Sequence, residues 1–163
     1  MTKNKKLIFA FTLILIILVS TTLSFGNFFF TTQYYDAPLN AYNDNCTYDI
    51  VYGETKATKQ IGLKTLDEEN CLFIGELNAE CFVVAEMSVK NEKYAFKGSY
   101  MLYDIKECAD DINTRNQTNV LSGSVSWSII YDESVLNSLF DVGSIDSYEL
   151  TDGYTIYLVV YSQ

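Results

Sequence analysis

Histidine is absent from this 163-residue chain, and it has only one proline, one arginine and one tryptophan. Without an imidazole the chain cannot build a Ser-His-Asp or Cys-His catalytic centre or a histidine-containing zinc site, and it lacks the commonest general base of enzymes. Its eight glycines are scattered singly, so there is no phosphate-binding loop and no dinucleotide fingerprint. The catalytic chemistry that stays open is a pair of carboxylates, as used in glycoside hydrolysis.

Carboxylates that could form such a pair lie near predicted turns in the second half of the chain. Acids in such positions usually solvate the surface, so we expect them to be structural and predict no catalytic residue and no cofactor. A carboxylate-dependent hydrolase acting on a cell-surface glycan is the alternative. The candidate acids are Asp104, Glu107, Asp110, Asp111, Glu133 and Asp141.

The first 26 residues have the pattern of a secretory signal peptide. Three lysines precede the 13-residue apolar run Leu7–Val19, and small polar residues follow up to Gly26. This length suits the roughly 7–15 residues of a signal core and falls short of the roughly 20 that span a bilayer. The alternative is an uncleaved hydrophobic anchor helix over residues 7–25. Both interpretations leave the lysines in the cytoplasm and predict an extracytoplasmic location for residues 27–163.

The rest of the chain is strongly acidic. The leader holds three of the 11 basic residues, so the remainder has 8 basic residues against 21 acidic ones and a formal charge of −13. Binding to phosphate groups requires clustered lysine and arginine. The charge therefore disfavours nucleic acid and anionic lipid surfaces as partners.

The pattern of apolar residues predicts an all-β domain with little helix. Thirteen tyrosines and ten phenylalanines beside a single proline favour strands. From Ser122 to Tyr131 apolar residues alternate with serines, which predicts a half-buried strand with Trp127 in the core. The run Phe82–Val84 is apolar on both faces, as in a central strand. Seven or eight such strands predict an antiparallel β-sandwich, with a flattened barrel as the alternative.

The chain organisation follows from the same pattern. Residues 27–45 lack a clear period and are predicted to be a tether, or else a lead-in that lies against the domain, and residues 46–163 form the domain itself. We expect a bend around Gly98, a polar loop without strands over 109–119 and a short helix over 134–141 capped by Ser134.

All four cysteines follow the leader, so they would lie in an oxidising compartment, where an even number predicts disulfides. We favour the pairs Cys46–Cys71 and Cys81–Cys108, because a turn at 78–80 would place Leu77 rather than Cys71 opposite Cys81. Zinc is disfavoured since no CxxC spacing exists. In a thiol-rich niche all four would instead stay reduced and buried.

Two further motifs are weak. The segment from Asp111 to Asn116 begins like a calcium loop, but Arg115 occupies a ligand position and Asn116 stands where glycine is required, so no metal is predicted. Asn45 and Asn116 begin N-glycosylation sequons, and Asn116 is the better candidate because it falls in the predicted loop.

The sequence therefore predicts a secreted or membrane-anchored β-sandwich that acts as a non-catalytic binding or surface component, with an extracellular protein or glycan as partner. A protein-binding inhibitor or accessory domain is a further alternative. A hydrolase would require a cleft with two acids about 5–9.5 Å apart. A sugar-binding protein would require coplanar exposed tyrosines. A protein-binding edge would require a long uncovered strand without lysine or a bulge.

Overall fold

The protein is described by a computed structural model in which the chain divides into two units, residues 1–33 and Tyr34–Gln163. The fold below is that of the second unit. Within the described part of the chain, no helix is both long and apolar enough to cross a membrane. The predicted leader lies outside the described residues, which are 32–46, 55–78, 81–104 and 116–162.

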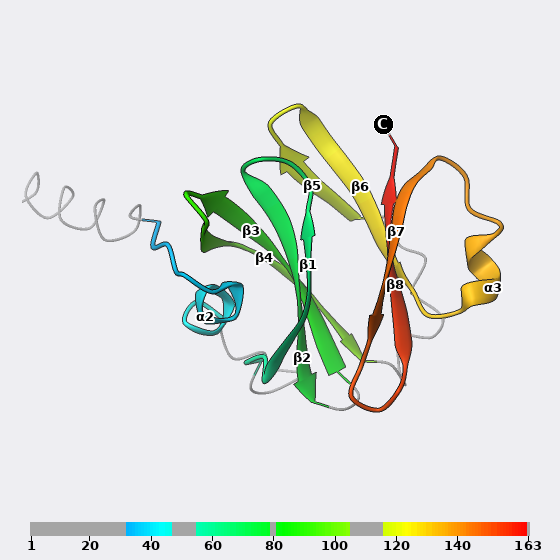
Figure 1. Cartoon of the computed structure of the whole chain (residues 1–163), viewed down its shortest axis with the longest axis horizontal. Coiled ribbons are helices and arrows are strands. Elements are labelled where there is room, and N and C mark those ends of the chain that lie inside the picture. The colour runs from blue at the N-terminus through cyan, green and yellow to red at the C-terminus, as the bar shows by residue number, and fades with distance from the viewer. Residues whose placement is uncertain (1–31, 47–54, 79–80, 105–115, 163) are drawn as a thin grey trace, which may run out of the picture. The chain divides into compact units, whose positions relative to one another are not determined.

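The described residues form eight strands in two antiparallel four-stranded sheets (Figure 1). Sheet 1 has the order β1-β2-β3-β4, with bounds Lys59–Thr65, Asn70–Asn78, Cys81–Lys90 and Lys93–Asp104. Sheet 2 has the order β5-β6-β8-β7, with bounds Asn116–Val120, Gly123–Ile130, Thr155–Tyr161 and Val142–Glu149. The prediction of a mainly antiparallel, sandwich-like β fold is confirmed.

The inner faces of the two sheets share one hydrophobic core. Because side chains alternate along a strand, every second residue of β2, β3, β6 and β8 points into it. Trp127 is buried there as predicted, and its indole nitrogen donates a 2.9 Å hydrogen bond to the hydroxyl of Thr118. The other core residues include Leu72, Ile74, Phe82, Val84, Ile129, Ile156 and Leu158.

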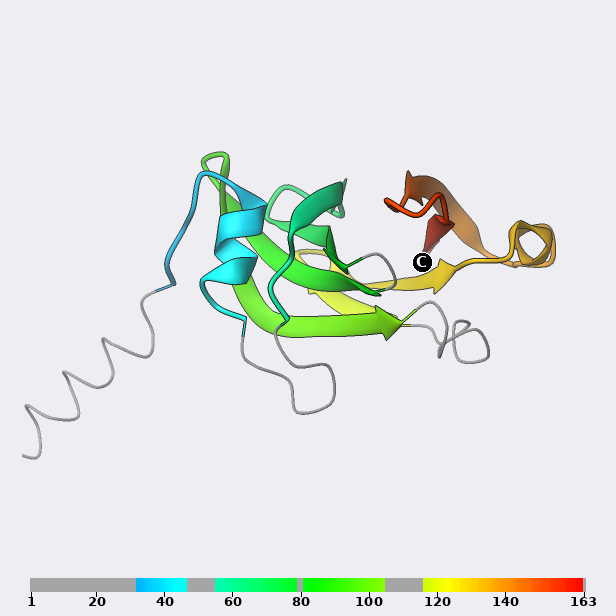
Figure 2. The same cartoon turned by 90° about the horizontal axis from the view of Figure 1, so that it is seen from below.

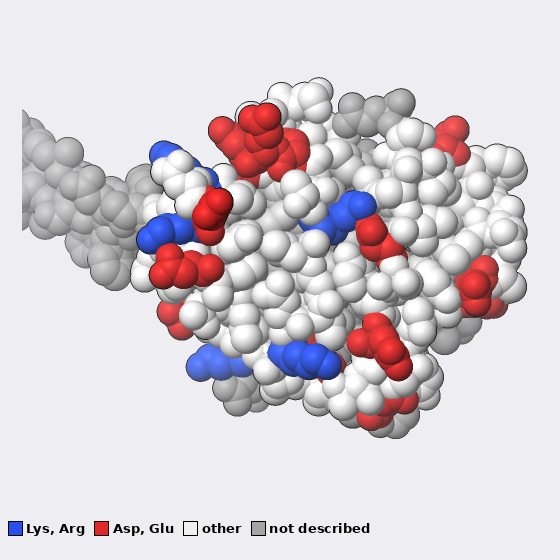
Figure 3. Space-filling view, in the orientation of Figure 1, with Lys and Arg blue, Asp and Glu red and all other residues white. Residues whose placement is uncertain are grey.

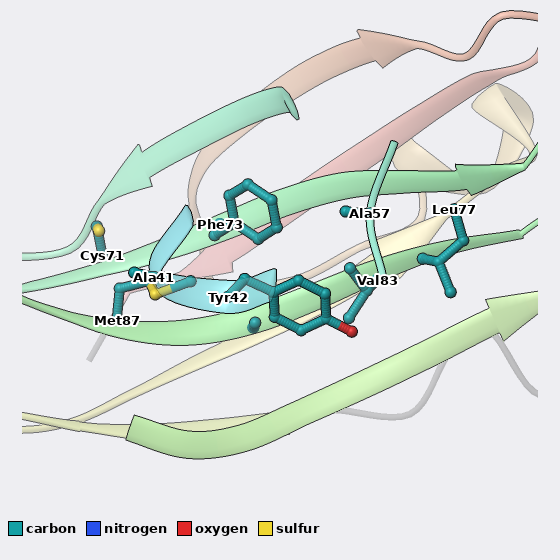
Figure 4. Close-up of a cluster of buried hydrophobic side chains, with 9 residues drawn as sticks. Ala41, Tyr42, Ala57, Cys71, Phe73, Leu77, Val83 and Met87 are labelled. Carbon is teal, nitrogen blue, oxygen red and sulfur yellow. The ribbon is translucent and has the colours of Figure 1, made fainter. Parts of the chain in front are cut away.

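A second core covers the outer face of sheet 1. Helix α2 (Pro38–Asn43) packs there, and Tyr42 stacks on Phe73 with ring centroids 5.5 Å apart (Figures 2 and 4). The Tyr42 hydroxyl donates a 2.8 Å hydrogen bond to the carbonyl of Thr55, so its polar atom is satisfied although the ring is buried. Helix α2, which falls within the segment predicted to be a tether or a lead-in, thus packs on sheet 1.

The outer face of sheet 2 is covered less completely. Helix α3 (Glu133–Leu136) has four residues, none of them buried, and packs near Ile130 and Val159. The carboxylate of Asp132 caps it by accepting a 2.9 Å hydrogen bond from the N–H of Ser134. The predicted helix over 134–141 is therefore wrong in its extent and in its cap, because the chain turns into β7 soon after α3.

Two more expectations have clear outcomes. The predicted bend at Gly98 is confirmed, since this residue has a φ of 82° at an irregularity of β4. The predicted strand-free loop over 109–119 is wrong at its end, because Asn116 already begins β5.

Candidate functional site

A small pocket opens where β4 and β5, the edges of the two sheets, come together. Its volume is about 80 Å³, enough for a few water molecules, whereas sites for small-molecule ligands usually enclose about 300–1,000 Å³. The lining contains a single carboxylate, that of Glu86, so it does not offer the acid pair of a glycosidase. The other lining residues include Ser99, Met101, Asn116, Gln117 and Trp127.

A bulge in β4 lies beside the pocket. The register between β3 and β4 shifts between Ala85 and Met87, where β4 contains extra residues. Gly98 occupies the left-handed region there, a conformation that costs glycine nothing. The bulge interrupts the alternation of side chains between the two faces of β4 at Lys97 and Ser99. Lys97 contacts residues of both sheets.

The contacts of Lys97 and Asp67 close one end of the sandwich. Nζ of Lys97 donates hydrogen bonds to Oδ1 of Asn70 at 3.0 Å and to the carbonyl of Asn119 at 3.3 Å. Oδ2 of Asp67 accepts a 2.8 Å hydrogen bond from the N–H of Leu121 in the β5–β6 turn of sheet 2. Desolvation by itself would raise the pKa of Asp67, but the hydrogen bonds from Leu121, Asn70 and Glu69 outweigh it and lower that pKa. These charged groups are engaged in holding the sheets together.

Glu76 holds the other end of the sandwich. It is the one buried acid among the described residues, with 3% of its surface exposed. Its carboxylate accepts hydrogen bonds from the N–H of Thr151 at 3.2 Å and from the Thr151 hydroxyl at 2.8 Å, which joins β2 to the β7–β8 turn. Both donors belong to Thr151, which lies in the other sheet's β7–β8 turn, so the Glu76 carboxylate has a structural role in joining the two sheets.

Among the candidate acids, those that the structure describes do not lie in the pocket. Glu107, Asp110 and Asp111 lie outside the described residues. Asp104, Glu133 and Asp141 are described, but none of them lines the pocket. Asp104 ends β4, and its Oδ2 lies 3.7 Å from Sγ of Cys81.

The sequon asparagines have different surroundings. Asn116 was expected in an exposed loop, but it is buried at the start of β5, and its amide donates a 3.4 Å hydrogen bond to the hydroxyl of Tyr103. Asn45 is exposed after α2. The other residues of the calcium-like segment, 111–115, lie outside the described residues.

The predicted Cys46–Cys71 disulfide is not formed, since both residues are free thiols. Cys71 faces α2 in the second core of sheet 1, and burial raises its pKa to about 12. The second predicted pair includes Cys108, which lies outside the described residues. Sequence spacing could not foresee the fate of Cys71, because its burial depends on α2 packing over it.

The four edge strands of the sheets differ in how they avoid pairing with other chains. Natural edges are protected by lysines, bulges, short length or covering segments. In sheet 1, β1 carries two lysines and a bulge, and β4 carries two lysines and a bulge and pairs at one end with Tyr35. In sheet 2, β5 has only five residues.

Strand β7 has little of this protection. It has eight residues with no lysine and no proline, and its one irregularity lies at its start, between Val142 and Ser144. From Ser144 to Glu149 it keeps unbroken register with β8, and no other described strand pairs with its free side. We call this run, Ser144–Glu149, the β7 edge.

The side chains around the β7 edge have contrasting inner and outer surroundings. On the inner side Tyr148 packs against Gly62 of β1, and Asp146 forms an ion pair with Lys64. Burial, assisted by the charge of Asp146, raises the pKa of Tyr148 to about 12. On the outer side Ile145 is 42% exposed.

Charge is distributed unevenly between the two halves of the domain. Residues 116–163 contain six Asp and Glu residues and no Lys or Arg, whereas residues 55–104 contain six lysines. In Figure 3 the blue atoms gather over α2 and sheet 1, and the side of α3 shows only red. On the outer face of sheet 2, burial and the carboxylate of Glu133 raise the pKa of Tyr157.

The described tyrosines form no sugar-binding platform. Tyr154 is the exposed one, at 49%, and the others are buried or half-buried.

No family model, no curated protein and no solved structure matches this chain. Its function must therefore be argued from the geometry of its own residues.

Proposed function

We propose that this chain is an exported, non-catalytic β-sandwich domain that binds another protein through the β7 edge. The observation that carries the proposal is the lack of lysine, proline and internal bulge in Ser144–Glu149, beside three edge strands that are each protected or short. An uncovered, regular edge can pair with an extended segment of a partner by main-chain hydrogen bonds.

The other functions that the sequence left open have less support. The pocket at β4 is small and holds one carboxylate, so it gives no support to a hydrolase with two carboxylates. A glycan-binding surface would need coplanar exposed tyrosines, and among the described tyrosines only Tyr154 is exposed. A protein partner is therefore favoured over a glycan.

Export is part of the proposal because the leader pattern precedes the domain. We propose that residues 1–26 are removed as a signal peptide, or that residues 7–25 stay as a membrane anchor with the domain on the outer side. Intact-mass measurement of fractionated cells, with and without reductant, distinguishes the two forms and reports any disulfide. A full-length protein found in the cytosol would contradict export.

Binding at the β7 edge is tested by site-specific photo-crosslinking in the full chain. A photoreactive residue at Ile145, which is 42% exposed on β7, is expected to form an adduct with a second protein. The matched control is Leu121, which is 65% exposed in the β5–β6 turn and should give no adduct. Equal adducts at both positions, or none at Ile145, would count against the proposal.

A further inference from the structure

We infer that the segment bound at the β7 edge is extended and cationic, and that it adds to sheet 2 as a fifth strand. This inference rests on the proposed function, since it names the chemistry of the partner that the edge would take.

The backbone supplies the length and form of the ligand. Six consecutive residues, Ser144 to Glu149, stay in register with β8. In an antiparallel edge strand, alternate residues direct both their N–H and their C=O groups away from the sheet. A partner segment of about six residues can therefore pair along the whole run, and the pairing gives affinity without regard to sequence.

The side chains supply the charge preference. Residues 116–163 hold six acids and no basic residue, so a segment lying on this half of the domain meets no cation from sheet 2. Glu149 is exposed on β7 itself. Glu133 lies beside Tyr157, which is the register partner of Ser147, so a second carboxylate stands over the outer face near the edge.

The inner side of the edge is already neutral. Asp146 is paired with Lys64, and Tyr148 packs against Gly62, so the charge available to a ligand is on the outer side. There Ile145 adds an exposed apolar surface at the end of the run opposite to Glu149. A segment that alternates basic and β-branched residues complements this arrangement, because opposite charges on adjacent strands attract.

A second copy of the chain fits this edge poorly. The chain has a formal charge of −10, and residues 116–163, which build sheet 2, hold six acids and no basic residue, so pairing two β7 edges would bring together two surfaces of like charge. Like charges on adjacent strands are destabilising. The charge pattern thus favours a different, basic polypeptide.

The probe is a blocked peptide of sequence Lys-Val-Lys-Val-Lys-Val, compared with Glu-Val-Glu-Val-Glu-Val, titrated into the exported protein. Binding is measured by calorimetry, and amide hydrogen exchange is followed by NMR. The basic peptide is expected to bind and to slow exchange at amides within Ser144–Glu149, and its affinity should fall as salt is added. The acidic peptide should not bind.

Matched variants place the peptide on β7. Ser147→Lys, at an exposed position of β7, should weaken binding of the basic peptide about two- to fivefold because it sets like charges on adjacent strands. Glu149→Gln should weaken it less and reduce its salt dependence. Gln60→Lys adds the same charge at an exposed position of β1 and should leave binding unchanged.

The inference fails if both peptides bind alike, if Gln60→Lys weakens binding as much as Ser147→Lys, or if sedimentation shows that the chain dimerises through β7. Failure here differs from failure of the proposed function. An adduct at Ile145 with a partner whose crosslinked segment is acidic would keep the proposed function and overturn the cationic ligand. Absence of any adduct at Ile145 would overturn the proposed function itself.

Discussion

The two sheets of the domain have the same antiparallel pairing, but the residues of their strands are buried to different extents. In sheet 1, every residue of β2 from Asn70 to Leu77 is buried, because sheet 2 covers one face and α2 covers the other. In sheet 2, β7 alternates between half-buried and exposed residues, because α3 is short and leaves its outer face partly open. Strand β2, which is covered on both faces, contributes to stability, whereas β7, which is covered on one face, leaves its outer face exposed to solvent.

Charge follows the same division. The lysines of the 55–104 segment lie on or next to the strands of sheet 1, whereas the segment that builds sheet 2 has only acids. Lysines protect an edge from further pairing, so their distribution leaves β7 as the edge with the least protection. The difference separates a part of the domain that holds the fold from a part that is available for binding.

The largest effect is expected from removing the ring that joins α2 to sheet 1. Phe73 is fully buried and stacks on Tyr42, so Phe73→Ala should lower the free energy of unfolding by about 3–5 kcal/mol, as for other buried aromatic residues. Denaturant unfolding of both proteins measures this change. The matched control is Phe140→Ala near the outer side of sheet 2, where Phe140 is 79% exposed and a change within about 0.5 kcal/mol is expected. Similar losses in both variants would contradict the contrast between the sheets.

An intermediate effect is expected where the ring of Tyr148, on the inner face of β7, packs against Gly62 of β1. A Cβ atom at Gly62 would overlap the ring of Tyr148, so Gly62→Ala should destabilise the protein by about 1–3 kcal/mol through overpacking. Truncating the ring as well, in Gly62→Ala with Tyr148→Ala, removes the overlap. A double-mutant cycle should then show a coupling energy, and strict additivity would mean that β1 and β7 do not touch there.

Most of the strands could be predicted because their signal is local. Alternation from Val125 to Tyr131 identified β6 and the burial of Trp127, and the chemistry of glycine identified the irregularity at Gly98. The length of helix α3, which has four residues, was overestimated. The apolar residues after Leu136 have a helical spacing but belong to the loop and to β7. A helical spacing of apolar residues over so few positions cannot distinguish a helix from a loop that leads into a strand.

The candidate site could not be predicted because it depends on what lies beside each strand. An edge strand and a central strand can have the same alternation, and only the order β5-β6-β8-β7 identifies β7 as an edge. Likewise the sequence around Cys71 does not distinguish it from a disulfide-forming cysteine of a secreted protein, and only the packing of α2 explains its burial. Ser128 is one of the serines that alternate with apolar residues in the predicted half-buried strand, yet it is fully buried and shares a 2.8 Å hydrogen bond with the hydroxyl of Tyr161.

The smallest effect is expected from acid pH at the junction between the sheets. The pKa of Asp67 is lowered in the folded protein, so its ionised form stabilises the fold above the ordinary value of 3.8, and this contribution is lost as pH falls through the lowered pKa. The stability difference between the protein and its Asp67→Asn variant should therefore be constant above about pH 5 and shrink below it.

The matched control for this test is Asp132→Asn. The pKa of Asp132 is also lowered, by hydrogen bonds from the side chain and N–H of Ser134, and these bonds cap α3 within the same segment of the chain. If the junction to Leu121 matters, denaturant unfolding between pH 3 and pH 7 should show a larger pH dependence for the loss of Asp67 than for the loss of Asp132. Equal pH dependence in the two variants would mean that Asp67 acts only within its own turn, because a cap on α3 reports local hydrogen bonding alone.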